Sequence, residues 1–107
     1  MSAIILPIPA WVQKFLARLP GWKETSVKSG YSIGRHSHEF LAVYFVFGIS
    51  SMNTGGKKRL LPPAAIVIVP RHVIHGWIGP QHGEGGVVGH FHPGHPAHRV
   101  ENVRAEI

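Results

Sequence analysis

The 107-residue chain contains no cysteine and no aspartate, and these absences exclude several kinds of site. Without cysteine there is no disulfide framework and no thiolate metal site, so histidine would have to hold any transition metal. The acidic residues are five glutamates, which disfavours catalysis by paired carboxylates. The sequence also lacks a phosphate-binding loop, a dinucleotide-binding glycine motif and a serine nucleophile elbow.

Long hydrophobic runs are missing as well. No apolar run approaches the roughly 20 residues that span a bilayer. The first ten residues lack the basic flank of a signal peptide, so we expect a cytoplasmic protein with no membrane segment. The net charge of +6 fits ordinary surface charge better than an anionic macromolecular partner, because the eleven Lys and Arg residues are scattered. We therefore do not expect direct DNA binding.

The length predicts a single domain over residues 1–107, with a helical N-terminal segment (1–21) and a β-rich remainder (22–107). Apolar residues recur at helical spacing from Trp11 to Leu19, and Pro20-Gly21 ends the helix. Short apolar runs bounded by Gly or Pro then predict strands. These runs are 40–47, 49–61 (a hairpin turning at 53–56), 65–69, 73–78 and 85–92. The pattern predicts an all-β antiparallel sandwich or barrel with one short leading helix.

Nine histidines are present, and two of them lie two residues apart. On an extended segment from 35 to 47, His36 and His38 would face the same side. The residues that continue this parity are Phe40, Ala42, Tyr44 and Val46. Such a strand can deliver two imidazoles to one metal from inside a barrel, although a pair of exposed or internally hydrogen-bonded histidines is the alternative. We expect His72 and His82 to be exposed turn residues.

Two segments resemble the paired motifs of the cupin superfamily. Gly30 is followed after five residues by His36-Ser37-His38, and Pro70 to His75 follows an apolar run. In cupins the first motif supplies two metal-binding histidines and usually a glutamate, and the second supplies a third histidine. The resemblance spans roughly Gly30 to Trp77. It implies a jelly-roll barrel, a double-stranded β-helix, in which His36, His38 and His75 bind a divalent metal.

The chain departs from that pattern at the glutamate, which would fall at Ala42 or Val43. Parity along 85–92 offers His90 or His92 as a possible fourth ligand, with a His-rich surface loop as the equal alternative. Imidazole ligands suit Zn, Ni, Fe and Cu alike, so the sequence does not select the metal. Four residues near the ligands would line a ligand pocket, although barrel packing also explains them. These are Phe40, Ala42, Tyr44 and Trp77.

The stretch from His36 to Trp77 is also similar to the ligand-sensing domain of AraC-type regulators. This likeness implies a sensor or binding module for a small molecule, anionic or sugar-like, held inside the barrel. The alternative is a small metal-dependent enzyme of the cupin type (dioxygenase, isomerase or lyase) with His90 or Tyr44 in proton transfer. A structural barrel without metal is the third possibility. Exposed sheet edges lead us to expect a homodimer. The chemistry of free imidazole predicts that metal occupancy falls between about pH 7 and 5, more steeply than one proton per metal.

Overall fold

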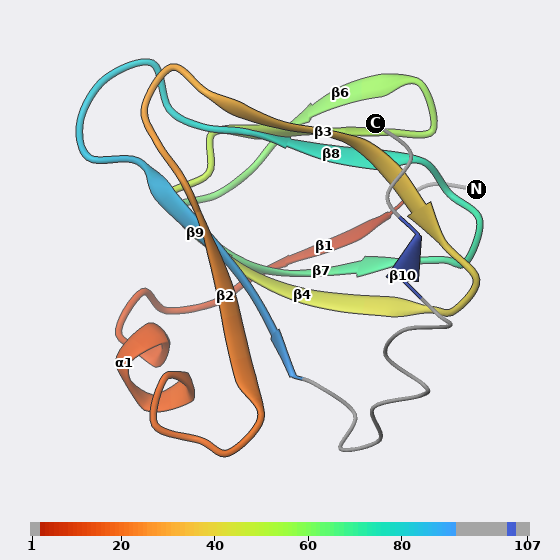
Figure 1. Ribbon diagram of the computed structural model, residues 1–107. Coiled ribbons are helices and arrows are strands. Elements are labelled where there is room, and N and C mark those ends of the chain that lie inside the picture. Colours follow the sequence, from red (N-terminus) through yellow and green to blue (C-terminus); the bar gives the residue numbers. More distant parts are fainter. Residues whose placement is uncertain (1–2, 92–102, 105–107) are drawn as a thin grey trace.

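The computed structural model describes residues 3–91 together with the backbone of 103–104. In this part of the chain, short strands form two five-stranded antiparallel sheets (Figure 1). The first sheet has the order β1 (Ile4–Pro7), β7 (Ala64–Val69), β4 (Ala42–Phe47), β9 (Gly86–Phe91), β2 (Trp22–Val27). The second has the order β10 (Val103–Arg104), β3 (Ser32–His38), β8 (His75–Ile78), β5 (Ser51–Thr54), β6 (Lys57–Leu60).

The chain passes repeatedly between the two sheets. From β2 to β5 it alternates between them at every connection, and it does so again from β6 to β10. The main hydrophobic core lies between the sheets, where Val46 and Val67 of the first meet Met52 and Trp77 of the second. The all-β prediction is therefore confirmed. The predicted closed barrel is not found among the described residues, because the two sheets have no strand in common.

The N-terminal segment contains a strand that the sequence analysis missed. Residues 4–7 form β1, which pairs antiparallel with β7 at the edge of the first sheet. The helix α1 covers only Val12–Leu16, so the predicted helix ending at Leu19 was too long. Leu16 packs on the outer face of the first sheet with Phe47 and Ala64. No helix in the described part of the chain is long and apolar enough to cross a membrane.

The same outer face remains apolar beyond the helix. Ile4 and Leu6 alternate with inward-facing Ile5 along β1, and both are about half exposed, at 53% and 47%. Their neighbours in register on β7 are Ile68 and Ile66. The outward positions next to these on β4 are Val43 and Phe45. This apolar outer face, defined by these six residues, carries no charged side chain.

Residues 35–47 do not form one continuous strand, contrary to the sequence-based expectation. β3 ends at His38 in the second sheet, and β4 begins at Ala42 in the first. The intervening residues carry the chain from one sheet to the other. The inner faces of the two strands still meet, because the sheets face each other across the core.

Candidate metal centre

Three histidines lie together on the inner side of the second sheet. His36 of β3 pairs in register with His75 of β8, and His38 follows two residues later on the same face. The ring centroids are 4.2 Å apart for His36 and His75, 5.0 Å for His36 and His38, and 5.2 Å for His38 and His75. One ring nitrogen from each residue lies within 4.8 Å of the other two. His38 and His75 are buried and His36 is partly buried.

A β-bulge turns the histidines of β3 inward. Ile33 pairs with Trp77 and His36 with His75, so three steps along β3 match two along β8. Without that extra residue, the side chains of Ile33 and His36 would point to opposite faces. Gly76 lies opposite the bulge, and a Cβ there would come 3.0 Å from the Ile33 carbonyl oxygen. Glycine at 76 therefore allows the close backbone approach that places the cluster.

Backbone carbonyls orient two of the rings. His36 Nδ1–H donates to the Gly34 carbonyl at 3.1 Å, and His75 Nδ1–H donates to the Val73 carbonyl at 3.0 Å. In a neutral imidazole only one nitrogen carries the proton, so the lone pair of each ring lies on Nε2. Hydrogen bonds of this kind fix the tautomer and orientation of metal-binding histidines in proteins.

Tyr44 connects the rings of His38 and His75. Its hydroxyl oxygen lies 2.7 Å from His38 Nε2 and 3.1 Å from His75 Nε2. Because His75 Nε2 accepts, Tyr44 donates its proton to His75, and His38 Nε2–H donates to Tyr44. This arrangement leaves His38 Nδ1 buried with no hydrogen-bond partner among the described residues.

Both fully enclosed imidazoles are held neutral. Burial lowers the pKa of His38 to about 4, with a further contribution from repulsion by His75, His36 and His90. Burial likewise lowers the pKa of His75 to about 4. Its hydrogen bond to Val73 acts in the opposite direction, and repulsion by His36 lowers the pKa further. A histidine binds a metal only when its ring nitrogen is unprotonated. The lone pairs of this cluster are therefore available near neutral pH.

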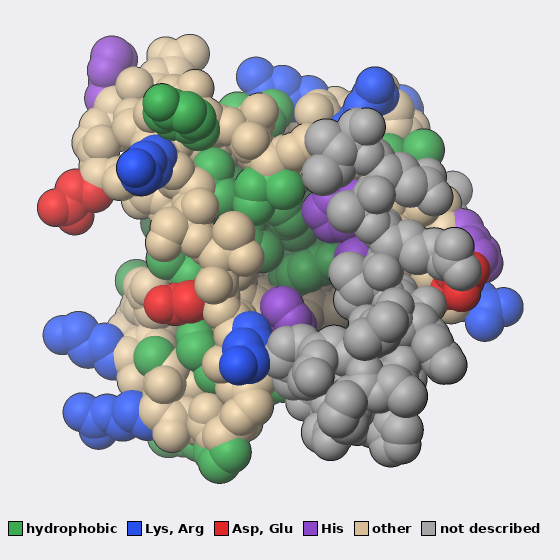
Figure 2. Space-filling model, viewed as in Figure 1, with side chains coloured by type: hydrophobic (Ala, Val, Ile, Leu, Met, Phe, Trp, Pro, Cys, Tyr) green, Lys and Arg blue, Asp and Glu red, His purple; other side chains and the backbone are tan. Residues whose placement is uncertain are grey.

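The donor set fits a divalent transition metal of the Zn, Ni, Fe or Cu kind. Three imidazoles converge, two of them with their lone pairs oriented by backbone carbonyls, and a buried nitrogen is left without a partner. Figure 2 shows that the space between the sheets opens on one face of the molecule, where hydrophobic and histidine side chains are visible inside it. No described glutamate joins the cluster, since Glu24, Glu39 and Glu84 are exposed.

The other predicted site residues are distributed as follows. His90 lies opposite Tyr44 with ring centroids 6.4 Å apart, but it does not belong to the group of converging nitrogens. His92 lies outside the described residues. His72 and His82 are exposed, as predicted, and the backbone of His72 has a φ of 67°.

The four residues expected to line a ligand pocket belong to the hydrophobic core or pack against it. Ala42, Tyr44 and Trp77 belong to the buried core, and Phe40 packs against it. The Phe40 ring stacks on His38 with centroids 4.9 Å apart. A polar neighbour that the sequence analysis missed is Thr54, which pairs with His75 and has a buried hydroxyl without a partner among the described residues. Its place beside His75 depends on the register between β5 and β8, which the sequence alone does not indicate.

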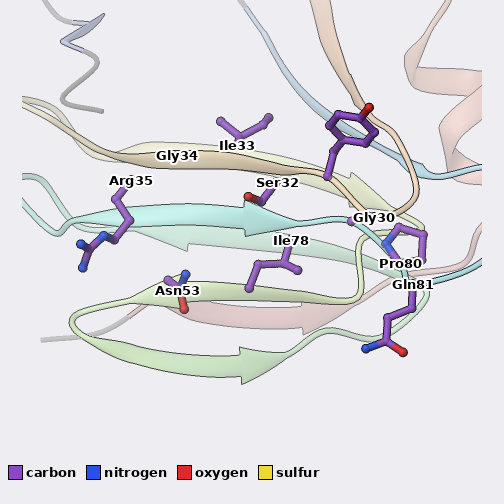
Figure 3. A pocket seen from close by; sticks show the side chains of 11 residues that line it. Gly30, Ser32, Ile33, Gly34, Arg35, Asn53, Ile78, Pro80 and Gln81 are labelled. Carbon is purple, nitrogen blue, oxygen red and sulfur yellow. The ribbon is translucent and has the colours of Figure 1, made fainter.

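A separate cavity of about 470 Å³ lies by the second sheet (Figure 3). Residues of β3, β5 and β8 line it, including Ser32, Asn53 and Ile78. Asn53 points away from the core side that carries Met52 and Thr54, so this cavity is on the outer face. Arg35 is its one charged lining residue, and no histidine or carboxylate lines it. It therefore offers no metal ligands.

Comparisons of the chain with protein-family models, with curated proteins and with solved structures gave no match.

Proposed function

We propose that this chain is a cupin-type metal-binding domain that holds one divalent metal on His36, His38 and His75. The observation that carries the proposal is the convergence of three imidazoles between two sheets, two of them oriented by backbone carbonyls. The repeated passage of the chain between those sheets supports a jelly-roll relationship. The motif layout around Gly30 and Pro70 supports it independently.

The proposed role is that of a sensor or binding module for a small, anionic or sugar-like molecule. When bound, the metal supplies a Lewis acid with open positions for oxygen atoms of that molecule. Three neutral imidazoles leave the positive charge of the ion uncompensated, which favours a carboxylate or a similar anion. The hydrophobic residues around the cluster exclude water and strengthen this attraction.

The test compares two single substitutions in protein purified without an affinity tag. His75→Ala removes a converging ligand and should abolish stoichiometric metal binding. His72→Ala removes an exposed histidine three residues away and should leave one metal ion per chain. Elemental analysis after dialysis measures both, and circular dichroism checks that each variant keeps its β structure. If His72→Ala proves the more damaging change, the cluster is not the metal site.

A small metalloenzyme is the second candidate, and the Tyr44 hydroxyl favours it. This hydroxyl lies within hydrogen-bond distance of two cluster nitrogens, where a proton-transfer group would be placed. The two functions differ in the fate of the bound molecule. A binding module returns it unchanged after incubation and denaturation, whereas an enzyme converts it.

We also propose that the working unit is a homodimer formed through the apolar outer face of the first sheet. Exposed apolar patches of this kind mark interaction surfaces. A face without charges suits its own copy around a twofold axis, because no like charges then oppose each other. The net charge of +6 resides elsewhere on the chain and does not oppose this contact directly.

A further inference from the structure

The Tyr44 hydroxyl lies beside the proposed metal ligands, and one of its two hydrogen bonds would be lost once a metal is bound. Tyr44 donates its proton to the lone pair of His75 Nε2, which is the same lone pair that His75 would give to an ion. His38 Nε2 is the other nitrogen within hydrogen-bond distance of the hydroxyl. When the His75 lone pair is directed to an ion, the phenol loses the acceptor of its proton, while its oxygen still accepts from His38 Nε2–H.

The ring of Tyr44 is enclosed on several sides, so the hydroxyl has no simple way to turn aside. Tyr44 is 8% exposed. Its ring lies edge-on to Trp77 and His90, with centroids 5.0 and 6.4 Å away, and tilted against His75 at 5.4 Å. A buried O–H donor left without an acceptor is destabilising. The structure therefore holds this hydroxyl beside the cluster in a position where its proton would have no acceptor once a metal is bound.

The distance between Tyr44 and His75 matches that between neighbouring ligands of one ion. Two atoms that each lie about 2.1 Å from a metal, at right angles, are about 3.0 Å apart. The hydroxyl oxygen of Tyr44 lies 3.1 Å from His75 Nε2, the atom whose lone pair would bind the ion, and His38 Nε2–H donates to the same oxygen at 2.7 Å. A phenolate would also supply the negative charge that three neutral imidazoles lack, in a cluster that no described glutamate joins.

From this geometry we propose that Tyr44 is the fourth protein ligand, through its phenolic oxygen. The O–H bond breaks, the proton leaves to bulk solvent, and the oxygen keeps the electron pair and donates it to the ion. Phenolate is a hard, anionic ligand, so among the candidate metals it favours iron and cupric copper, and it stabilises iron in the ferric state. The inference rests on the metal-binding function proposed above and assigns the chemistry of that same site.

The experiment is a titration of tag-free, metal-free protein with ferric or cupric ion, followed by visible absorption and by elemental analysis. Tyrosinate bound to either ion gives a ligand-to-metal charge-transfer band in the visible range. The band should grow to one equivalent of metal. It should vanish in Tyr44→Phe while that variant still retains metal on its histidines.

The chain offers a matched control, since its other tyrosine, Tyr31, is 68% exposed. Tyr31→Phe should keep the full band. Stoichiometric metal without a band, or a band that survives in Tyr44→Phe, would overturn the tyrosinate ligand and leave the histidine site standing. Failure of the wild-type protein to bind metal would overturn both proposals. Resonance Raman spectra of the wild-type protein, excited within the band, test the same ligand without relying on any variant, because they enhance phenolate ring vibrations only when tyrosinate is bound.

Discussion

The two buried imidazoles make the stability of the metal-free protein depend on pH, and their pKa values set the size of the effect. The pKa of both His38 and His75 is about 4 in the folded protein, against 6.5 for the ordinary side chain. Between these pH values the unfolded chain binds a proton on each ring and the folded chain does not. These two rings therefore leave the free energy of unfolding unchanged above pH 6.5 and lower it as the pH falls from 6.5 towards 4.

The expected loss is large compared with the stability of a small domain. From pH 7 to 5, each ring lowers the free energy of unfolding by about 2 kcal/mol, and the two together by roughly 4 kcal/mol. Domains of this kind are stable by only about 5–15 kcal/mol. Urea unfolding in the presence of a chelator at pH 7, 6 and 5 measures the loss through tryptophan fluorescence, to which Trp77 contributes from the buried core.

Two variants identify the source of the pH dependence. His75→Gln removes one of the two shifted groups and should reduce the dependence by about half. His82→Gln changes an exposed histidine and should leave it unaltered. A free energy of unfolding that changes by less than about 1 kcal/mol between pH 7 and 5 would refute the claim that folding buries neutral imidazoles.

Three further predictions follow from the same geometry. Between pH 7 and 5.5 the three histidines together should release no more than one proton per bound ion, because His38 and His75 are already unprotonated, and this is less than free imidazoles would release; the Tyr44 phenol would add one proton at every pH, and a competition titration that shows more than two protons released per ion would contradict this. Gly76→Ala should lower the free energy of unfolding by about 1–3 kcal/mol and weaken metal binding, since the added Cβ meets the bulge; unchanged urea midpoints and metal content would contradict it. Light scattering at tens of micromolar should show a dimer. Leu6→Lys should dissociate it, whereas Leu60→Lys, on the second sheet, should not; a monomeric wild-type protein would contradict the proposed dimer.

Much of the strand pattern could be predicted from the sequence, because apolar runs between Gly and Pro residues identify buried strands. The hairpin of β5 and β6 and the buried strand β7 were expected at nearly their observed positions. The strand β1 was missed because Pro7 and Pro9 interrupt a short apolar run that becomes a strand only by pairing with β7. Tertiary pairing of this kind leaves little local signal.

The site shows the same division between local and tertiary information. The parity of His36 and His38 is a local property, and the structure keeps it within β3. The meeting of His38 with Tyr44 was expected along one extended strand, but it arises across two facing sheets. The bulge that turns the histidines inward depends on pairing with β8, and two-residue periodicity alone does not predict it.

Anomalous X-ray scattering from crystals of the metal-loaded, tag-free protein tests the central claim most directly. Data collected at the absorption edge of the bound metal locate the ion without assumptions about its ligands. We predict one strong peak per chain between the sheets, about 2.1 Å from a ring nitrogen of each of His36, His38 and His75. The absence of a peak there, or a peak held only by histidines of residues 90–98, would contradict the proposed metal centre.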